Sequence, residues 1–251
     1  MKIIQLTDTH LFANDSDMMH GVCCNAAFDE TIRYLINHDL NDTDMIFLTG
    51  DISQDMTEKS YHKISESLSH LKIPVYWIPG NHDDNTIAES VFSKYKFFKR
   101  QNHLDSDHWY FIFLDSTIKN SHAGYLSEEQ LSLLKSELSC APPNKKIAIA
   151  LHHHPIETQT PLIDEYILQN KNEFWGIVLQ HSVSLIICGH VHGDYQIKHK
   201  GVIVEASPAT CLQWKKGAIT LDMVNEMGYK IYQFNGDYYS AYARLLKSCQ
   251  S

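Results

Sequence analysis

The sequence predicts an α/β fold in which two mixed β-sheets pack together and are flanked by helices, a four-layer αββα sandwich. From Ile3 to Cys188, short apolar runs alternate with helical patterns, which is typical of layered α/β proteins. From Tyr195 onward, short alternating runs indicate antiparallel strands. The chain of 251 residues shows no internal repeat, low-complexity segment or linker. We therefore expect residues 1–251 to form one domain.

Buried apolar runs and amphipathic repeats define the elements of the first part. Strands are expected at Ile3–Leu6, Met45–Leu48, Val75–Ile78, Tyr110–Leu114, Ile147–Leu151 and Leu185–Cys188. Helices are expected at Ala26–Ile36, Thr57–Leu71, 127–139 and 164–180. Asp55 is a candidate cap for the second helix. Ser127 and Gln130 form a capping-box pattern at the third, in which each side chain bonds the other residue's backbone amide.

The last part reads as strands joined by tight turns. The expected strands are Gln196–His199, Val202–Glu205, Ala218–Asp222, Lys230–Phe234 and Tyr238–Leu245. Asn235-Gly236 between the last two predicts a type I′ hairpin, because both central residues of that turn need a positive φ.

Composition narrows the classes of function. The formal net charge of −9 argues against a nucleic-acid groove, which normally carries a basic stripe. No stretch approaches the roughly 20 apolar residues of a membrane span, and the first residues lack the features of a signal peptide. We expect a cytoplasmic protein without nucleic-acid or membrane partners. Its cysteines are then expected to stay reduced, namely Cys23, Cys24, Cys140, Cys188, Cys211 and Cys249.

Polar residues stand directly after five predicted strands. They are Asp8 and His10, Asp51, Asn81 and His82, His152, and His190 and His192. In an open α/β sheet, the loops at the carboxyl ends of the strands converge on one crevice. One such residue alone is more often a helix cap or a hydrogen-bonded core residue. The D-x-H and H-x-H spacings, however, turn both side chains the same way, because a strand repeats every two residues. The combination predicts a metal site.

These motifs resemble a known signature. D-x-H, G-D, G-N-H-D, H-x-x-P and G-H-x-H occur complete and in order, as in the calcineurin-like metallophosphoesterase superfamily. Stretches such as T-D-T-H-L-F-A, W-I-P-G-N-H-D and S-P-A-T-C-L-Q-W make the chain similar to the bacterial class III cyclic AMP phosphodiesterases, over residues 3 to about 215. The resemblance implies two divalent metal ions. The resemblance favours iron or manganese, with zinc as the alternative. The mixed carboxylate, imidazole and amide ligands fit all three metals.

The resemblance also implies roles for single residues. One metal would be held by Asp8, His10, Asp51 and His192, and the other by Asp51, Asn81, His152 and His190, so that Asp51 bridges them. A hydroxide formed between the ions would attack phosphorus. His82 would protonate the departing 3′-oxygen, and Asp83 would orient the His82 imidazole. The rival interpretations are a His82 that only hydrogen-bonds a ligand and an Asp83 that caps a helix. The expected substrate contacts are His10, Asp51, Asn81, His82, His152 and His192.

Other residues are candidates for substrate recognition. Trp214 and Phe12 could stack on a base, within or near the recognition segments Pro155–Asn170 and Pro208–Trp214. His122 lies in N-S-H-A, where the similar subfamily carries P-H, and is a candidate to replace that contact. His153 and His154 are expected behind the ligands or at the surface, and His20 at the surface.

Three functions follow from these patterns. The leading hypothesis is hydrolysis of 3′,5′-cyclic nucleotides, cyclic AMP to 5′-AMP. The second is a broader phosphodiesterase acting on 2′,3′-cyclic nucleotides, glycerophosphodiesters or dinucleoside polyphosphates. Protein phosphatase activity is disfavoured, because G-D-I-S-Q-D and G-N-H-D lack the arginine and glutamate of that branch. The third is a non-catalytic scaffold, which the complete set of ligands disfavours.

Overall fold

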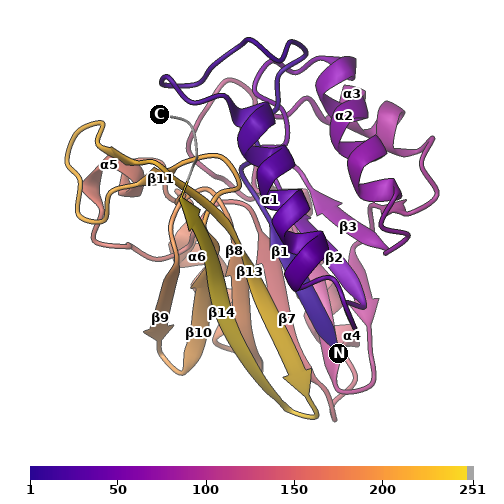
Figure 1. Ribbon diagram of the computed structural model, residues 1–251. Helices are drawn as coiled ribbons and strands as arrows, with labels where there is room; N and C mark the ends of the chain where they lie inside the picture. Colours follow the sequence, from indigo (N-terminus) through magenta and orange to yellow (C-terminus); the bar gives the residue numbers. More distant parts are fainter. Residues whose placement is uncertain (248–251) are drawn as a thin grey trace.

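Two six-stranded sheets pack face to face in the computed structural model, which describes residues 1–247 (Figure 1). The first sheet has the order β14-β13-β1-β2-β3-β4, comprising Tyr238–Lys247, Glu226–Asn235, Lys2–Leu6, Met45–Thr49, Val75–Ile78 and Phe98–Lys99. The second has the order β5-β6-β7-β8-β10-β9, comprising His103–Asp105, Trp109–Phe113, Lys146–Leu151, Val183–Cys188, Val202–Ala206 and Tyr195–His199.

Helices cover the outer face of each sheet. α1 (Cys24–His38), α2 (Glu58–Ser69) and α3 (Asn85–Phe92) share a buried core with the first sheet. α4 (Glu128–Cys140) and α6 (Lys171–Val178) share another with the second sheet. A third core, which includes Ile3, Phe47, Phe111 and Leu185, lies between the sheets. The predicted αββα layering is confirmed.

Both sheets are mixed, with parallel strands at their centres. β1, β2, β3 and β4 run parallel in the first sheet, and β6, β7, β8 and β10 in the second. The carboxyl ends of β1, β2 and β3 therefore lie at one edge of the first sheet, and those of β7 and β8 at one edge of the second. This arrangement places the polar motifs at the strand ends.

Two predicted elements are wrong. The helix expected at 164–180 is divided into α5 (Pro161–Asp164) and α6, because Asp164 folds back to accept hydrogen bonds from the amides of Thr158 and Thr160. The strand expected at Ala218–Asp222 is a turn between the short strands β11 (Gln213–Trp214) and β12 (Met223–Val224). β10 also pairs in parallel with β8, although antiparallel strands were expected there.

Some predicted local contacts also differ. Thr57, not Asp55, caps α2, and Asp55 accepts from Thr57 instead. Ser127 caps α4 as expected. Its capping box is incomplete, because Gln130 Oε1 accepts from the Asp115 amide. The β13–β14 hairpin is confirmed, but its central residues are Gly236 and Asp237, since Asn235 pairs with Tyr238. Of these two only Gly236 has a positive φ, +58°, which fits a type II′ turn rather than type I′.

Candidate metal centre

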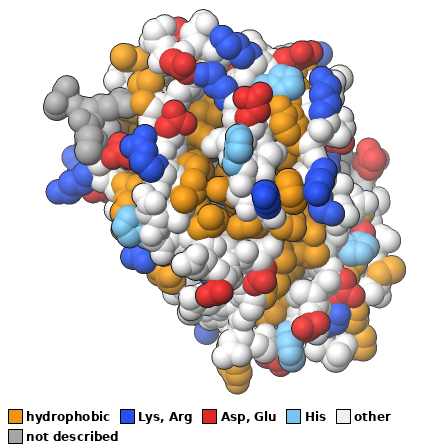
Figure 2. Space-filling view, turned by 45° about the vertical axis from the view of Figure 1, so that its right-hand side comes forward, with side chains coloured by type: hydrophobic (Ala, Val, Ile, Leu, Met, Phe, Trp, Pro, Cys, Tyr) orange, Lys and Arg blue, Asp and Glu red, His pale blue; other side chains and the backbone are white. Residues whose placement is uncertain are grey.

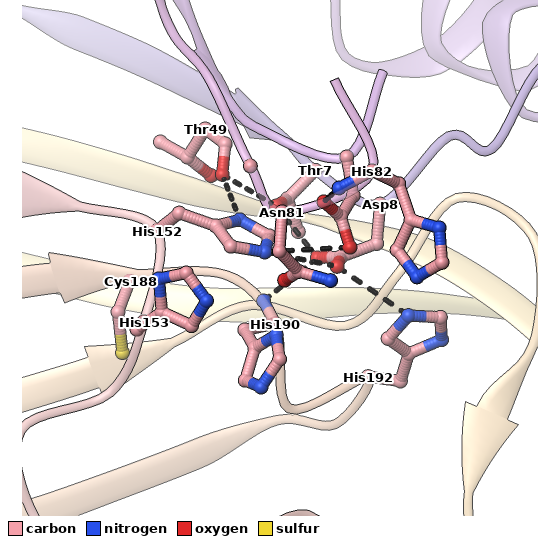
Figure 3. Close-up of polar contacts among 12 residues, drawn as sticks. Thr7, Asp8, Thr49, Asn81, His82, His152, His153, Cys188, His190 and His192 are labelled. Carbon is pink, nitrogen blue, oxygen red and sulfur yellow. Dashed lines mark hydrogen bonds and ion pairs between the residues drawn. The ribbon is translucent and has the colours of Figure 1, made fainter. Parts of the chain in front are cut away.

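Five loops at the carboxyl ends of β1, β2, β3, β7 and β8 bring their polar side chains together (Figure 3). Asp8, His10, Asp51, His152 and His192 are all almost fully buried. Two hydrogen bonds fix the loops to each other: Asp8 N–H donates to Gly50 O at 3.0 Å, and His10 N–H to Asp51 O at 3.0 Å. Backbone hydrogen bonds between the two loops, rather than side-chain contacts, thus fix where Asp8, His10 and Asp51 lie relative to each other.

The facing atoms are spaced as ligands of shared ions. His192 Nε2 lies 3.4 Å from Asp8 Oδ1, and His152 Nε2 lies 3.4 Å from Asp51 Oδ2. His10 Nε2 lies 3.7 Å from Asp51 Oδ2 and 3.1 Å from His192 Nε2. Metal–ligand bonds of about 2.0–2.2 Å separate neighbouring ligands by roughly 3–3.5 Å. One carboxylate oxygen of Asp51 stands between His10 and His152, as a bridging ligand would.

The outer nitrogen of three imidazoles is held by an oxygen. His152 Nδ1 lies 2.7 Å from Thr49 O, His192 Nδ1 lies 2.9 Å from Leu212 O, and His10 Nδ1 lies 2.7 Å from Gln54 Oε1. Because these oxygens only accept, each Nδ1 carries the proton and each Nε2 turns its lone pair toward the centre. A metal needs this tautomer.

Several buried polar atoms at the centre have no hydrogen-bond partner within residues 1–247. They include Asp8 Oδ1, Asn81 Oδ1, His152 Nε2 and His190 Nε2. Buried polar atoms are otherwise nearly always hydrogen-bonded, because an unpaired one costs about 1–3 kcal/mol. All four belong to residues expected to bind metal. The donor set of carboxylate, imidazole and amide fits divalent transition metals.

The backbone is strained at the same residues. Asp8, His10, Asp51, His190 and His192 have φ between +43° and +68°. This left-handed region is uncommon for residues other than glycine and costs about 1–3 kcal/mol each. Gly80 permits a close approach, since a Cβ there would lie 2.2 Å from Asp51 N and Oδ1. Five of the twelve non-glycine residues with positive φ within residues 1–247 are thus expected metal ligands, which points to a functional site.

Burial and neighbouring charges shift the pKa values of the side chains in this centre in opposite directions. Burial, with nearby imidazoles, lowers the pKa of His10 to about 3. Burial also opposes protonation of His152, but the Asp51 and Asp8 carboxylates outweigh it and raise its pKa to about 9. The same pairing holds the pKa of Asp51 well below its usual range despite burial. The two carboxylates thus favour positive charge at this position.

Some expected ligands lie further from the carboxylates. His190 belongs to a potential ligand cluster with His152 and His153, and its backbone amide donates to Asp8 Oδ2 at 3.0 Å. Asn81 Nδ2 lies 3.3 Å from His122 Nδ1. His153 is buried as expected behind the ligands, and both its nitrogens are engaged, with Ser116 Oγ at 2.8 Å and His122 O at 3.2 Å.

The predicted contact between Asp83 and the His82 imidazole is not among the hydrogen bonds of residues 1–247. The Asp83 carboxylate instead accepts from the amides of Ile52, Ser53 and Gly80 and from Tyr61 Oη. It therefore joins the loop after β2 to the loop after β3. The helix-cap interpretation is also wrong, since Asp84 caps α3. Burial and the Asp51 charge raise the pKa of Asp83 to about 7.

His82 faces the centre next to His10 and His122. Its ring centroid lies 5.1 Å from that of His10 and 5.2 Å from that of His122. Its backbone amide donates to Asp51 Oδ1 at 2.8 Å, which fixes its position relative to the bridging carboxylate.

A cavity of about 310 Å³ opens over the centre. Its polar lining includes His10, Asp51, Asn81, His82, His190 and His192. Its apolar and aromatic lining, which we call the apolar wall, consists of Met19, Leu162, Ile163, Tyr166, Trp214 and Leu221. Of the two candidate stacking residues, Trp214 lines the cavity, whereas Phe12 packs against the Met19–Cys211 cluster. His122 and Gln54 line the cavity as well, and so does exposed His20, whose role the sequence did not indicate.

Figure 2 shows a face on which acidic and basic side chains are interspersed.

Within residues 1–247, no helix is long and apolar enough to cross a membrane. The cysteines Cys24, Cys140, Cys188 and Cys211 form no disulfide, and Cys249 lies outside the described residues.

The fold and the clustered ligands define a metallophosphoesterase. A family model described as Calcineurin-like phosphoesterase matches residues 1–194, and the chain belongs to that family. The predicted superfamily is confirmed. A solved dimetal phosphatase from Danio rerio superposes with a TM-score of 0.72, over 97% of this chain and 95% of that one. At 12% identity it shows the fold alone.

Relatives from bacteria are more similar in sequence. The chain is 36% identical to the 3′,5′-cyclic adenosine monophosphate phosphodiesterase CpdA of Vibrio vulnificus, over 86% of this chain and 78% of that protein. It is 35% identical to a probable cyclic nucleotide phosphodiesterase of Coxiella burnetii, over 92% of both chains. It is 33% identical to a 3′,5′-cyclic-nucleotide phosphodiesterase of Nostoc, over 94% of this chain and 89% of that protein.

Proposed function

We propose that this protein hydrolyses 3′,5′-cyclic nucleotides, cyclic AMP to 5′-AMP, with two divalent metal ions. The observation that carries the proposal is the cluster of unpaired ligand atoms beside a cavity that two of their residues, Asn81 and His190, line together with apolar side chains. A phosphate needs the polar lining, and a nucleoside needs an apolar wall. The names of the bacterial relatives support the same substrate class.

The residues divide into two ligand sets that share one carboxylate. Asp8, His10 and His192 would hold one ion, and Asn81, His152 and His190 the other, with Asp51 common to both. Bound there, the ions would supply Lewis-acid activation of phosphate and water. We expect iron or manganese, with zinc as the alternative. Thr49, Leu212 and Gln54 would keep the imidazoles in the ligating tautomer. The substrate phosphate would lie among His10, Asp51, Asn81, His82, His152 and His192.

His82 is our candidate for the acid that protonates the leaving 3′-oxygen. Burial lowers its pKa, with His122 and His152 adding to that effect and Asp51 opposing it. The imidazole is therefore neutral in the free site. A bound phosphodiester brings a negative charge, which favours the protonated form. Asp83 would act indirectly, because its bonds to Ile52, Ser53 and Gly80 hold the backbone on both sides of the site.

A substrate panel tests the proposal. The purified protein, loaded with Mn²⁺, is assayed on 3′,5′-cyclic AMP, 3′,5′-cyclic GMP, 2′,3′-cyclic AMP and bis(4-nitrophenyl) phosphate. We expect cyclic AMP to be cleaved to 5′-AMP, with retention of the 5′-phosphate seen by chromatography. Cleavage of the aryl diester alone would overturn the cyclic-nucleotide assignment. A preference for 2′,3′-cyclic AMP would favour the broader phosphodiesterase.

A further inference from the structure

Half of the apolar wall, namely Leu162, Ile163 and Tyr166, lies on a segment that one buried histidine contacts. His154 follows the expected ligand His152 by two residues and is about 1% exposed. Its Nε2 lies 3.1 Å from Asp164 Oδ1. Its carbonyl also accepts from the Leu168 amide at 3.1 Å. His154 therefore contacts the segment that carries Leu162, Ile163 and Tyr166, and its ring also stacks on that of the expected ligand His190, with centroids 5.7 Å apart.

Asp164 organises that segment from inside. Its Oδ1 accepts from Thr158 N at 2.8 Å and from Thr158 Oγ1 at 2.9 Å, and its Oδ2 accepts from Thr160 N at 3.1 Å. With His154 the carboxylate thus has four donors. α5 is only four residues long, so its own backbone bonds do little to fix it. The position of Leu162, Ile163 and Tyr166 therefore depends on this carboxylate.

The opposite part of the wall is tied to the same segment. Leu162 N–H donates to Ala218 O at 3.0 Å, and Gly217 N–H donates to Thr160 Oγ1 at 3.1 Å. α5 and β11 accordingly lie next to each other in Figure 1. Trp214 is fixed to the metal side, because its amide donates to His192 O at 3.0 Å and its ring stacks on His192 with centroids 5.2 Å apart. Tyr166 and Leu221 remain exposed at the rim, by 36% and 55%.

We propose that the apolar wall receives the nucleobase, and that His154 is the positioning residue that fixes this wall through Asp164. The inference rests on the proposed function. The polar residues that line the cavity are engaged with each other or expected to bind metal, so the base lies against apolar and aromatic surface. Such surface binds bases by stacking and burial, with little selection among them. Loss of the wall should therefore weaken the binding of substrates that carry a base and leave the binding of base-free substrates unchanged.

The experiment compares cyclic AMP with a base-free analogue, 1-deoxyribose 3′,5′-cyclic phosphate. In His154→Ala we expect KM for cyclic AMP to rise about tenfold with kcat within threefold, as for one lost group of contacts. KM for the base-free analogue should stay unchanged. Because the His154 ring also stacks on His190, metal content is measured in each variant and the kinetic constants are compared at equal metal occupancy. His154→Gln, whose amide can still donate to Asp164, should recover most of the KM. A rise in KM for both substrates, or a fall in kcat with unchanged KM, would overturn the positioning role.

Exposed wall residues give a test that does not depend on the stability of His154 variants. Tyr166→Ala and Leu221→Ala should raise KM for cyclic AMP but not for the analogue. Tyr238→Ala is the matched control, since Tyr238 is 82% exposed on β14 and does not line the cavity. Unchanged KM in both wall variants would overturn the base assignment. The proposed function has its own test: it fails if the wild type does not cleave cyclic AMP. The base assignment fails if the wild type cleaves cyclic AMP but the wall variants keep its KM, so the two failures are distinguishable.

Discussion

Asp8 and His190 join the two sheets at the centre: Asp8 Oδ2, after β1, accepts a hydrogen bond from the backbone amide of His190, after β8, at 3.0 Å. The same oxygen accepts from Thr7 Oγ1 at 2.7 Å, which leaves Asp8 Oδ1 facing the centre without a partner. The carboxylate thus uses one oxygen for structure and offers the other as a ligand.

Metal binding should depend on Asp51 more than on any neighbouring carboxylate. We expect two ions per chain in the wild type, and less than one in Asp51→Asn, because both ligand sets share that side chain. Asp84→Asn is the control, since asparagine caps a helix as well as aspartate does. Metal analysis after gel filtration measures the ratio. Two ions retained by Asp51→Asn would contradict the shared-ligand assignment.

Removal of the ions should lower the melting temperature. A ligand present at 100 times its dissociation constant stabilises the folded state by about 2.7 kcal/mol. Without ions, no binding free energy offsets the cost of the strained backbone and of the unpaired polar atoms at the centre. Calorimetry before and after treatment with a chelator, followed by Mn²⁺ readdition, gives the difference. An unchanged melting temperature would indicate that no ion binds the folded site tightly.

His82→Ala should slow cleavage of cyclic AMP by about 10²–10⁴-fold, the usual contribution of a general acid. The effect should be much smaller for bis(4-nitrophenyl) phosphate, because nitrophenolate leaves without a proton. Metal content should not change. The control is His70→Ala, at the exposed residue that directly follows α2. Equal losses on both substrates would assign His82 to phosphate binding or to support of a ligand instead.

Gly80→Ala should disrupt the centre, since its Cβ would lie 2.2 Å from Asp51 N and Oδ1. We expect lost metal and a destabilisation of about 1–3 kcal/mol from overpacking. Gly176→Ala in α6 is the matched control, because nothing lies within 4 Å of its Cβ. It should stabilise the protein by about 0.5–1 kcal/mol. Urea denaturation with metal analysis distinguishes the two. Full metal occupancy in Gly80→Ala would show that the loop can shift.

Stability should fall at acidic pH through Asp39. Burial alone would raise the pKa of Asp39, but hydrogen bonds from Arg244 and Tyr229 outweigh burial and lower it. A carboxyl with a depressed folded-state pKa stabilises the fold above its unfolded pKa and loses that contribution as pH falls through the folded value. Arg244→Ala should therefore cost about 1 kcal/mol at pH 7 and less below about pH 4. Urea midpoints at both pH values measure it, with the exposed Lys215→Ala as control. A cost independent of pH would exclude the charge as its cause.

The strands that carry the centre were predictable, because β1, β2, β3, β7 and β8 are buried runs that end at polar motifs. The partners of the imidazoles were not. Thr49 and Leu212 act through backbone carbonyls, which any residue would supply. The prediction of one helix at 164–180 was wrong because the Asp164 side chain accepts hydrogen bonds from the preceding amides of Thr158 and Thr160. The alternation at Ala218–Asp222 reflects exposed Ile219 and Leu221 rather than a half-buried strand.

The hydrogen bond between Asp8 and His190 spans 182 positions of the chain. Because closing so long a loop costs much entropy, we expect this contact to form late in folding, once both sheets have met. An ion that needs donors from both sheets can therefore bind only after the slow step. We expect metal to leave the refolding rate of this protein nearly unchanged and to lower its unfolding rate, so that the ions stabilise the native state kinetically.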